Sequence, residues 1–557
     1  MQALVECVPN FSEGRNRTVI DAIAREIADT EGVKLLDVDP GADTNRTVVT
    51  FVGTPATVLE AAFRAIKRAA ELIDMRKHRG AHPRLGATDV CPFVPLSGCT
   101  MADCVALARQ LGARVGEELA IPVYLYEEAA TRPERRNLAD IRQGEYEGLP
   151  EKLKDPAWVP DFGPAVFNPK TGATVIGARE FLIAYNINLN TRDRRLAQEI
   201  ALNIRESGRL QRDAQGNILR DEHGNPVRKP GKFQAVKAVG WYIPEYEQAQ
   251  VSLNLVNYKV TPPHVVFDEV CREAELLGLR VTGSELVGLI PLQALLMAGR
   301  YYLEKQGKSP GLPEKDLVDI AVRSLGLNDI SPFAPEKKII EYQLGERRGP
   351  LVKMAVADFA DELSTDSPAP GGGSVAALAG ALAAGLAAMV ANLSVGKKGY
   401  ESVASELRDV ATKAQELKDA LLAAVDEDTR AFNRVMEAFA LPKKSEEQQA
   451  ARHEAIQEAT RLATQVPLHV MQHAVHTLEL AAVVAQKGLT SAVSDAGVAA
   501  IMAKAAAEGA ALNVRINVGS LADESFVATS KATAEDLLAR ARDLASSVVG
   551  MVESKLS

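Results

Sequence analysis

The sequence changes its pattern near residue 335, and this change limits the possible folds more than any other feature. Before it, short apolar runs typical of strands alternate with amphipathic runs typical of helices. After it, long segments rich in Ala, Glu, Lys, Leu and Arg repeat their apolar residues at helical spacing. We therefore predict a multidomain chain with α/β lobes first and an all-α helical bundle last.

The α/β part carries the same order of signals, βαββαβ, in each of its two halves. The halves also contain similar closing segments, GATDVCPFVPL at residues 86–96 and TGSELVGLIPL at residues 282–292. We predict two similar lobes, each a sheet with helices on one face, and we expect a ligand in the cleft between them.

These patterns also predict domain boundaries. We assign residues 1–180 to the first lobe, 181–333 to the second, 334–352 to a linker and 353–557 to the all-α domain. The polar segment 212–232 interrupts the second lobe with Gly, Asn and Pro turns, so we predict an exposed hairpin or a flexible loop there.

Charge and cysteine content indicate the compartment and the partners. The chain has a formal net charge of −9, which disfavours nucleic acid as a partner. Its five cysteines form no CxxC pair, and an odd number suits a reduced compartment better than disulfides or a zinc site. The first residues lack the basic and long apolar regions of a signal peptide. We therefore expect a cytoplasmic protein.

One segment of the all-α part is long and apolar. Residues 375–393 carry no charge and have the length of a membrane span. They are mostly alanine and glycine, so we predict a helix buried in the bundle and no membrane partner. A short strand at residues 513–518 is an alternative to helix in this part. The alanine-rich helices also suggest a dimer through this domain, and hence a homo-oligomer built from dimers.

His82 lies in the loop RGAHPRLGATDV, whose glycine and proline residues break any helix. Imidazole titrates near neutrality and a rigid loop fixes its position, so His82 is a candidate general acid and base flanked by Arg79 and Arg84. A surface histidine satisfied by backbone contacts is the alternative. A metal pair with His78 is a weaker one, because a glycine intervenes.

Two groups of acids are further candidates. Asp37 and Asp39 alternate onto one face at a strand end, where they would orient a histidine, bind an amine or only cap a turn. In the segment VDEDTRAF, Asp428 lies one turn from Ala424 and Phe432 and is expected to point inward. It is therefore either a buried acid tuned for proton transfer or part of a salt-bridged helix surface.

Three other patterns have both a functional and a structural interpretation. The segment GGGS at residues 371–374 precedes a predicted helix and either attracts an anion or caps the helix. Residues 161–172 are dense in Gly and Pro and form either an ordered loop with exposed backbone donors or an interdomain linker. His469, His473 and His476 share a helix face, which we interpret as a solvated or dimer-facing stripe rather than a metal site.

Long motifs in this chain resemble two known domains. The formiminotransferase family is similar in LVECVPNFSEGRN, LLDVDPGADTNRTVVTFVG, RGAHPRLGATDVCPFVPL, PVYLYEEAA, GEYEGLPEKLKDPAWVPDFGP and GATVIGAREFLIAYNINL. The cyclodeaminase domain is similar in APGGGSVAALAGALAAGLAAMV and VDEDTRAFNRVMEAFALPK. The order resembles that of the bifunctional formimidoyltransferase-cyclodeaminase family over nearly the whole chain.

The resemblance implies two reactions of histidine degradation and folate metabolism. The first transfers the formimino group of N-formimino-L-glutamate to N5 of tetrahydrofolate, a co-substrate. The second closes 5-formiminotetrahydrofolate to 5,10-methenyltetrahydrofolate and releases ammonia. The transferase histidine of the family corresponds to His82, and the cyclodeaminase acid to Asp428, with Asp426 the weaker match. The folate-binding loop of the family matches these residues: Gly163, Pro164, Ala165, Val166, Phe167, Asn168, Pro169, Lys170, Thr171 and Gly172.

The implied chemistry needs proton transfer and neither a metal nor a redox cofactor. His82 would take the proton of N5 and return one to the leaving glutamate nitrogen, while arginines near its loop pair with carboxylates. Asp428, its pKa raised by burial, would serve the cyclisation. The alternatives are that one half alone is active, that a folate-binding module is fused to a helical scaffold, or that the chain is a metal-dependent hydrolase using His78, His82 and nearby acids.

Overall fold

The computed structural model describes residues 3–42, 44–80, 82–345 and 348–557. It divides into two compact units. Unit 1 comprises Met1–Ala294 with Leu325–Gly345, and unit 2 comprises Leu295–Ser324 with Glu346–Ser557. The chain therefore passes from one unit to the other three times.

The first lobe of unit 1 is a seven-stranded sheet in the order β3-β4-(β1, β2)-β5-β7-β6, with β1 and β2 both lying between β4 and β5. Strands β3, β4, β1 and β5 pair antiparallel, whereas β7 lies parallel to β5 and β6. Its elements are β1 Leu4–Cys7, β2 Asn10–Phe11, α1 Arg17–Ala28, β3 Val33–Gly41, β4 Arg46–Gly53, α2 Pro55–Leu72, β5 Thr88–Ser97, α3 Met101–Glu118, β6 Val123–Glu127, α4 Leu138–Ile141, α5 Glu145–Lys152 and β7 Thr174–Ala178.

The second lobe repeats the core of the first. Its four-stranded sheet has the order β11-β12-β8-β13, so each strand matches one of β3-β4-β1-β5 in position, direction and chain order. Its elements are β8 Ile183–Leu189, α6 Arg194–Ile204, β9 Arg209–Leu210, β10 Arg228–Lys229, β11 Val236–Ile243, β12 Gln248–Leu255, α7 Pro263–Leu276 and β13 Val281–Val287. The predicted βαββαβ repeat is therefore confirmed.

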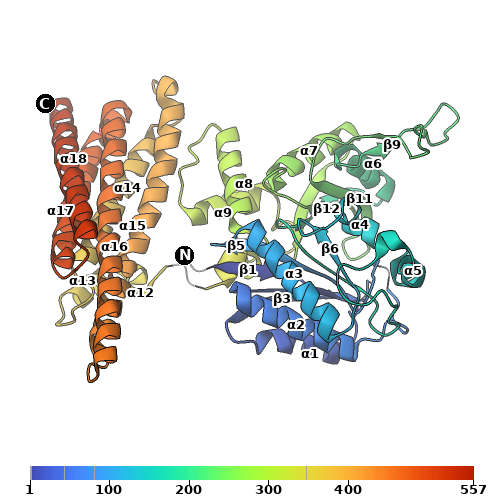
Figure 1. Ribbon diagram of the computed structural model, residues 1–557. Helices are drawn as coiled ribbons and strands as arrows, with labels where there is room; N and C mark the ends of the chain where they lie inside the picture. The colour runs from blue at the N-terminus through green and yellow to red at the C-terminus, as the bar shows by residue number, and fades with distance from the viewer. Residues whose placement is uncertain (1–2, 43, 81, 346–347) are drawn as a thin grey trace. The chain divides into compact units, whose positions relative to one another are not determined.

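Helices cover one face of each sheet (Figure 1). In the first lobe, one core joins Ile23 of α1, Ile66 of α2 and Leu111 of α3 to sheet residues such as Phe51 and Phe93. In the second lobe, α6 packs on β11 and β12, and α7 packs on β8 and β13. The opposite sheet faces are left to line a cavity, described below.

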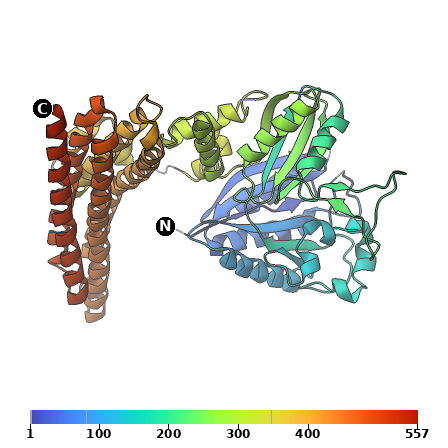
Figure 2. The ribbon, with the colours of Figure 1, turned by 90° about the horizontal axis from the view of Figure 1, so that it is seen from above.

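Unit 2 is helical, as predicted, and its long helices α14 to α18 lie side by side (Figure 2). Helix α8, Leu292–Lys305, begins in unit 1 and ends in unit 2. The short helices α10 Pro335–Lys338 and α11 Ile340–Gln343 belong to unit 1. The following helices belong to unit 2: α9 Glu314–Ser324, α12 Pro350–Lys353, α13 Val356–Leu363, α14 Gly372–Ser394, α15 Ala404–Ala440, α16 Glu446–Lys487, α17 Val493–Val518 and α18 Glu524–Leu556.

Local patterns predicted most elements, with three differences. Strand β7 was not predicted. It is five residues long and lies between the loop 161–172 and the strand that begins at Ile183, so it has no separate pattern of its own. The last strand of the second lobe, which the apolar run ELVGLIPL predicts to begin at residue 285, begins at Val281. The alternative strand at 513–518 is wrong, since these residues end α17, where Val514 and Val518 pack into the helical core.

Two predicted segments behave as expected. Residues 209–229 include a hairpin, in which β9 pairs with β10, that projects from the second lobe (Figure 1). Helix α14 is the one described helix long and apolar enough to cross a membrane, and most of it is buried against α15, α16 and α17. Its alanines bring neighbouring helices close together, as a buried bundle helix requires.

Candidate functional site

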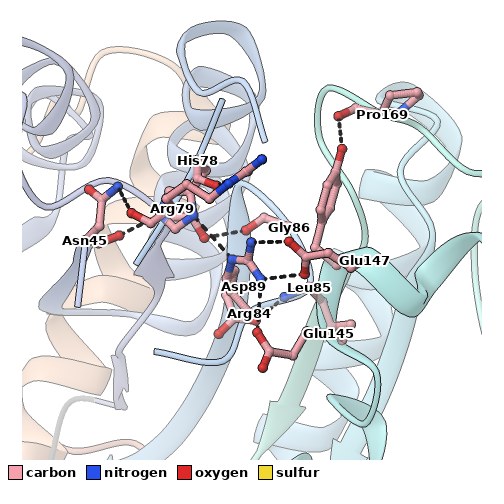
Figure 3. A network of polar contacts seen from close by, with 12 residues as sticks. Asn45, His78, Arg79, Arg84, Leu85, Gly86, Asp89, Glu145, Glu147 and Pro169 are labelled. Atoms are coloured by element: carbon pink, nitrogen blue, oxygen red, sulfur yellow. Dashed lines mark hydrogen bonds and ion pairs between the residues drawn. The ribbon is translucent and has the colours of Figure 1, made fainter. Parts of the chain in front are cut away.

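The loop that carries His82 connects α2 to β5, and hydrogen bonds of buried polar groups attach it to the rest of the lobe (Figure 3). Asp89, fully buried at the start of β5, accepts a hydrogen bond from the backbone N–H of Leu85 at 2.9 Å. His78 donates from Nε2 to the carbonyl of Asn45 at 2.8 Å. These two hydrogen bonds fix the described residues on either side of His82.

Arg84 belongs to this support and does not face a ligand. Its side chain is 8% exposed and pairs with Glu147 at 2.7 Å and Glu145 at 2.9 Å (Figure 3). Its Nε donates to Nδ1 of His78 at 3.3 Å. Both nitrogens of His78 are thus hydrogen-bonded within the protein, so this histidine is not free to ligate a metal, and the metal-dependent hydrolase loses one of its two histidine ligands.

The contacts of His82 define its protonation state. Its Nδ1 lies 2.7 Å from the carbonyl oxygen of Pro83, which can only accept, so Nδ1 carries the proton. Its Nε2 lies 2.7 Å from Nη1 of Arg46, which can only donate, so Nε2 presents its lone pair. Burial, Arg46 and Arg142 lower the pKa of His82 to about 4, with Asp89 and the Pro83 carbonyl opposing them. His82 is therefore a neutral imidazole at physiological pH.

His82 lines a cavity of about 780 Å³ between the open faces of the two sheets of unit 1. Alternation explains its walls: in β4, Val49 and Phe51 point to the helices, while Arg46, Val48 and Thr50 line the cavity. The second sheet contributes residues such as Ala184 and Asn254. The predicted cleft between the lobes is present as this cavity.

The cavity holds charges of both signs. Its cationic side chains are Arg46, Arg142, Arg179 and Lys237, and its acidic ones are Glu6, Asp37, Asp39, Glu127, Glu128, Glu145 and Glu180. Asp37 and Asp39 line it together, as strand alternation predicts. Burial and the neighbouring Asp39 raise the pKa of Asp37, while Lys338 opposes the rise.

Glu6 is the buried acid that our sequence reasoning missed. It lies on β1, is 4% exposed and lines the cavity. Burial raises its pKa to about 7, and Glu341 adds to the rise while Arg179 opposes it. The signal for it was a carboxylate within an apolar strand, LVEC, at a position that alternation places opposite the helix-packed Val5 and Cys7.

The loop at residues 163–172 lies directly beside the His82 loop. Gly172 pairs with Gly86, and the amide of Ala87 donates to the carbonyl of Thr171 at 2.7 Å. A Cβ at Gly172 would lie 2.2 Å from the Leu85 carbonyl oxygen, so this close approach requires glycine. Among the described residues that line the cavity, however, none comes from this loop.

The acid in unit 2 meets the glycine-rich helix start. Asp428 of α15 accepts a hydrogen bond from the Ser374 hydroxyl at 3.2 Å, at the N-terminus of α14. A Cβ at Gly373 would lie 2.1 Å from Oδ1 of Asp428. Burial raises the pKa of Asp428, although the hydrogen bonds from Ser374 oppose the rise. Two patterns that the sequence separates by fifty residues therefore form one site.

Asp426 has a different role from its neighbour. It is 3% exposed, and its Oδ1 accepts from the backbone N–H of Leu351 at 2.9 Å. Its Oδ2 accepts from Val352 at 3.3 Å, so both oxygens serve the first turn of α12. This carboxylate caps a helix and faces away from the Ser374 contact.

The histidine stripe of α16 lies apart from these groups. His473 is half-buried, and burial together with His469 and His476 lowers its pKa. Within the described residues, no three His, Cys, Asp or Glu side chains lie close enough together to share a metal ion.

Comparison with known proteins gives matches along the chain. Residues 4–179 match the formiminotransferase domain, N-terminal subdomain, and residues 184–345 match the formiminotransferase domain. Residues 355–536 match the model described as formiminotransferase-cyclodeaminase.

Named relatives cover either the whole chain or one part of it. A formimidoyltransferase-cyclodeaminase of Gallus gallus is 46% identical over 557 residues, which is 100% of both chains. A glutamate formimidoyltransferase of Thermoplasma acidophilum is 47% identical over 311 residues, or 56% of this chain and 95% of its own. A methenyltetrahydrofolate cyclohydrolase of Methylorubrum extorquens is 41% identical over 202 residues, or 36% of this chain and 97% of its own.

Proposed function

The chain belongs to the formiminotransferase-cyclodeaminase family, and from this premise we propose that it is a bifunctional folate enzyme of histidine degradation. Unit 1 transfers the formimino group from N-formimino-L-glutamate to N5 of tetrahydrofolate. Unit 2 closes 5-formiminotetrahydrofolate to 5,10-methenyltetrahydrofolate and releases ammonia. The observation that carries the proposal is the full-length match to the Gallus gallus protein at 46% identity.

The transfer needs a base and an acid at one place. N5 of tetrahydrofolate attacks the formimino carbon, loses its proton, and the bond from that carbon to the glutamate nitrogen breaks. We assign both proton steps to Nε2 of His82, because Nε2 carries the lone pair of the neutral ring and His82 lines the cavity. A placed base of this kind contributes roughly 10²–10⁴ in rate.

The folate contact in this unit is the loop at residues 163–172. Its backbone pairing with the His82 loop supports this assignment, because a folate held there would lie beside the catalytic loop. Five of its residues are exposed: Gly163, Ala165, Val166, Pro169 and Lys170.

The cyclisation is intramolecular. N10 attacks the formimino carbon and loses its proton, and the nitrogen of the formimino group leaves as ammonia. Asp428 serves as the proton carrier, because burial favours its protonated form while the hydrogen bonds from Ser374 at the start of α14 still allow the charged form. Neither reaction as written requires a metal or a redox cofactor.

One assay tests both reactions. The protein is mixed with tetrahydrofolate and N-formimino-L-glutamate, and glutamate, ammonia and the absorbance of 5,10-methenyltetrahydrofolate are measured. His82→Ala should lower glutamate release by roughly 10²–10⁴. Asp428→Asn should preserve glutamate release and stop methenyl formation. Glutamate without methenyl product in the unmodified protein would contradict the assignment of unit 2.

A second candidate for unit 2 is hydrolysis of 5,10-methenyltetrahydrofolate. The cyclohydrolase of Methylorubrum extorquens, which aligns over 97% of its length with part of this chain, favours it. The two reactions involve the same ring of 5,10-methenyltetrahydrofolate: the cyclodeaminase closes it, and the cyclohydrolase opens it with water. Supplying 5,10-methenyltetrahydrofolate alone separates them, since only a cyclohydrolase would consume it without added ammonia faster than the uncatalysed rate.

We also propose a homo-oligomer built from dimers through unit 2. Neighbouring helices α14 and α17 expose a row of large apolar side chains: Val375, Leu382, Met389, Leu393, Val498, Ile501, Leu512 and Ile516. A second copy covering this face would remove it from water. Leu382→Glu should lower the mass measured by light scattering, whereas Leu441→Glu, also exposed but on another helix end, should not.

For the compartment and for other partners we keep the expectation from composition. The described cysteines are all free thiols, which supports a reduced, cytoplasmic setting. The acidic net charge supports the expectation that nucleic acid is not a partner. Fractionation of cells with an antibody to the chain tests the compartment.

A further inference from the structure

The catalytic lone pair of His82 is occupied in the ligand-free structure. Nη1 of Arg46 lies 2.7 Å from Nε2, and Nδ1–H is bound by the Pro83 carbonyl at 2.7 Å. Neither ring nitrogen is therefore free to take a proton from a substrate. The base is present, but the hydrogen bond from Arg46 masks it, because this bond occupies the lone pair of Nε2.

The surroundings of Arg46 favour its release from Nε2 of His82. Within the part of the chain that the structure describes, His82 is the hydrogen-bond partner of the Arg46 side chain, and no carboxylate pairs with it directly. Arg142, which is paired with Asp89, lies close enough to repel Arg46. Burial and, to a smaller extent, this repulsion lower the pKa of Arg46, while Asp89 and Asp39 oppose the fall. A guanidinium in such surroundings binds a carboxylate more strongly than a neutral imidazole, and does so through two N–H groups.

We propose that Arg46 binds a carboxylate of N-formimino-L-glutamate and that this binding withdraws it from His82, so that the substrate itself frees the base. The proposal rests on the function proposed above for unit 1. Arg46 is a positioning residue in this scheme, because it binds the substrate and acts on the proton transfer through His82.

The exchange also changes the strength of the base. The charged groups that face His82 are Arg46 from β4, Arg142 next to α4 and Asp89 from β5, with the Pro83 carbonyl at Nδ1. In the free protein burial, and after it Arg46 and Arg142, hold the pKa of His82 to about 4, too low for a base near neutral pH. A substrate carboxylate that neutralises Arg46 moves that pKa upward, toward the range in which imidazole serves best.

The exchange of Arg46 from His82 to a substrate carboxylate also makes the transfer specific for formimino donors that carry a carboxylate. A formimino donor without carboxylates, such as formamidine, would leave Arg46 on His82 and react slowly even when it fits. Replacing Arg46 by Gln should then lower transfer from N-formimino-L-glutamate by about 10- to 10²-fold, because a hydrogen bond to a charged group is lost. Transfer from formamidine should be equal or faster, because the charged donor on Nε2 has gone.

The test is the titration of His82 in the full chain. Histidine labelled with ¹³C at Cε1 gives one signal for each ring, and His82→Gln identifies the signal of interest. The pKa of His82 should be near 4 in the free protein and at least one unit higher with saturating L-glutamate, the carboxylate-bearing product. In Arg46→Gln it should already be raised and should no longer respond to L-glutamate.

Two results would overturn the proposal: a His82 pKa that L-glutamate does not raise, or one that Arg46→Gln does not raise. Arg76→Gln is the matched control, since that exposed arginine pairs with Asp74 and should leave the His82 signal unchanged. The transfer assay on the same samples separates the two hypotheses. Turnover without a response of His82 refutes the masking alone, and absent turnover refutes the function proposed for unit 1.

Discussion

At the scale of single residues, Glu6 links the cavity to stability. Its pKa of about 7 exceeds the ordinary 4.5, so between these values the folded chain binds more protons than the unfolded one, and stability falls as pH rises through that window. Glu6→Gln should remove this loss, which amounts to at most about 3 kcal/mol. Thermal unfolding of the ligand-free protein at pH 5 and pH 8 checks it. The exposed Glu151→Gln serves as control, and an equal effect of both variants would contradict the burial argument.

A second residue-scale prediction concerns the contact between Gly373 and Asp428. A methyl group at Gly373 would lie 2.1 Å from the carboxylate, so Gly373→Ala must displace Asp428 or the start of α14. We expect cyclodeaminase activity to fall at least tenfold and transferase activity to be unchanged. Gly550→Ala in α18 is the matched control: nothing lies within 4 Å of its Cβ, and it should stabilise the helix by about 0.5–1 kcal/mol.

At the scale of elements, we predict different roles for Asp426 and Asp428, which lie two residues apart on α15. Asp426 caps α12, so Asp426→Asn should lower the stability of unit 2 by about 1 kcal/mol and preserve cyclisation. Asp428→Asn should stop cyclisation without loss of stability at neutral pH, because burial already disfavours its charged form. Urea unfolding and the methenyl assay on both variants check this. The opposite pattern would move the proton carrier to Asp426.

At the scale of the whole molecule, the chain does not divide at one point. Residues 295–324 belong to unit 2 although residues 325–345 belong to unit 1. The carbonyl of Gly311 accepts hydrogen bonds from Asn392 and Gln415, and a Cβ at Gly311 would lie 2.4 Å from that of Ala411. We therefore expect a fragment of residues 292–557 to melt at a higher temperature than one of residues 346–557. Equal melting temperatures would mean that α8 and α9 add nothing to the bundle.

The sequence by itself determined the features that depend on local spacing. Periods of two and of about four residues distinguish strands from helices, so the repeated βαββαβ order, the bundle and the buried α14 were predictable. Glycine and proline marked the His82 loop for the same reason. Contiguous motifs identified the family, and the resemblance predicted the roles of His82 and Asp428.

The tertiary structure alone decided which partner each polar group meets. The sequence suggested Arg84 as an anion-binding residue beside His82, yet Arg84 pairs with Glu145 and Glu147, and Arg46, 36 residues before His82, takes the place beside the imidazole. Alternation along a strand places a side chain on one of two faces, but it does not tell which face is covered by helices and which lines a cavity. Partners, burial and the resulting pKa values depend on segments that are distant along the chain, and those meet only after folding.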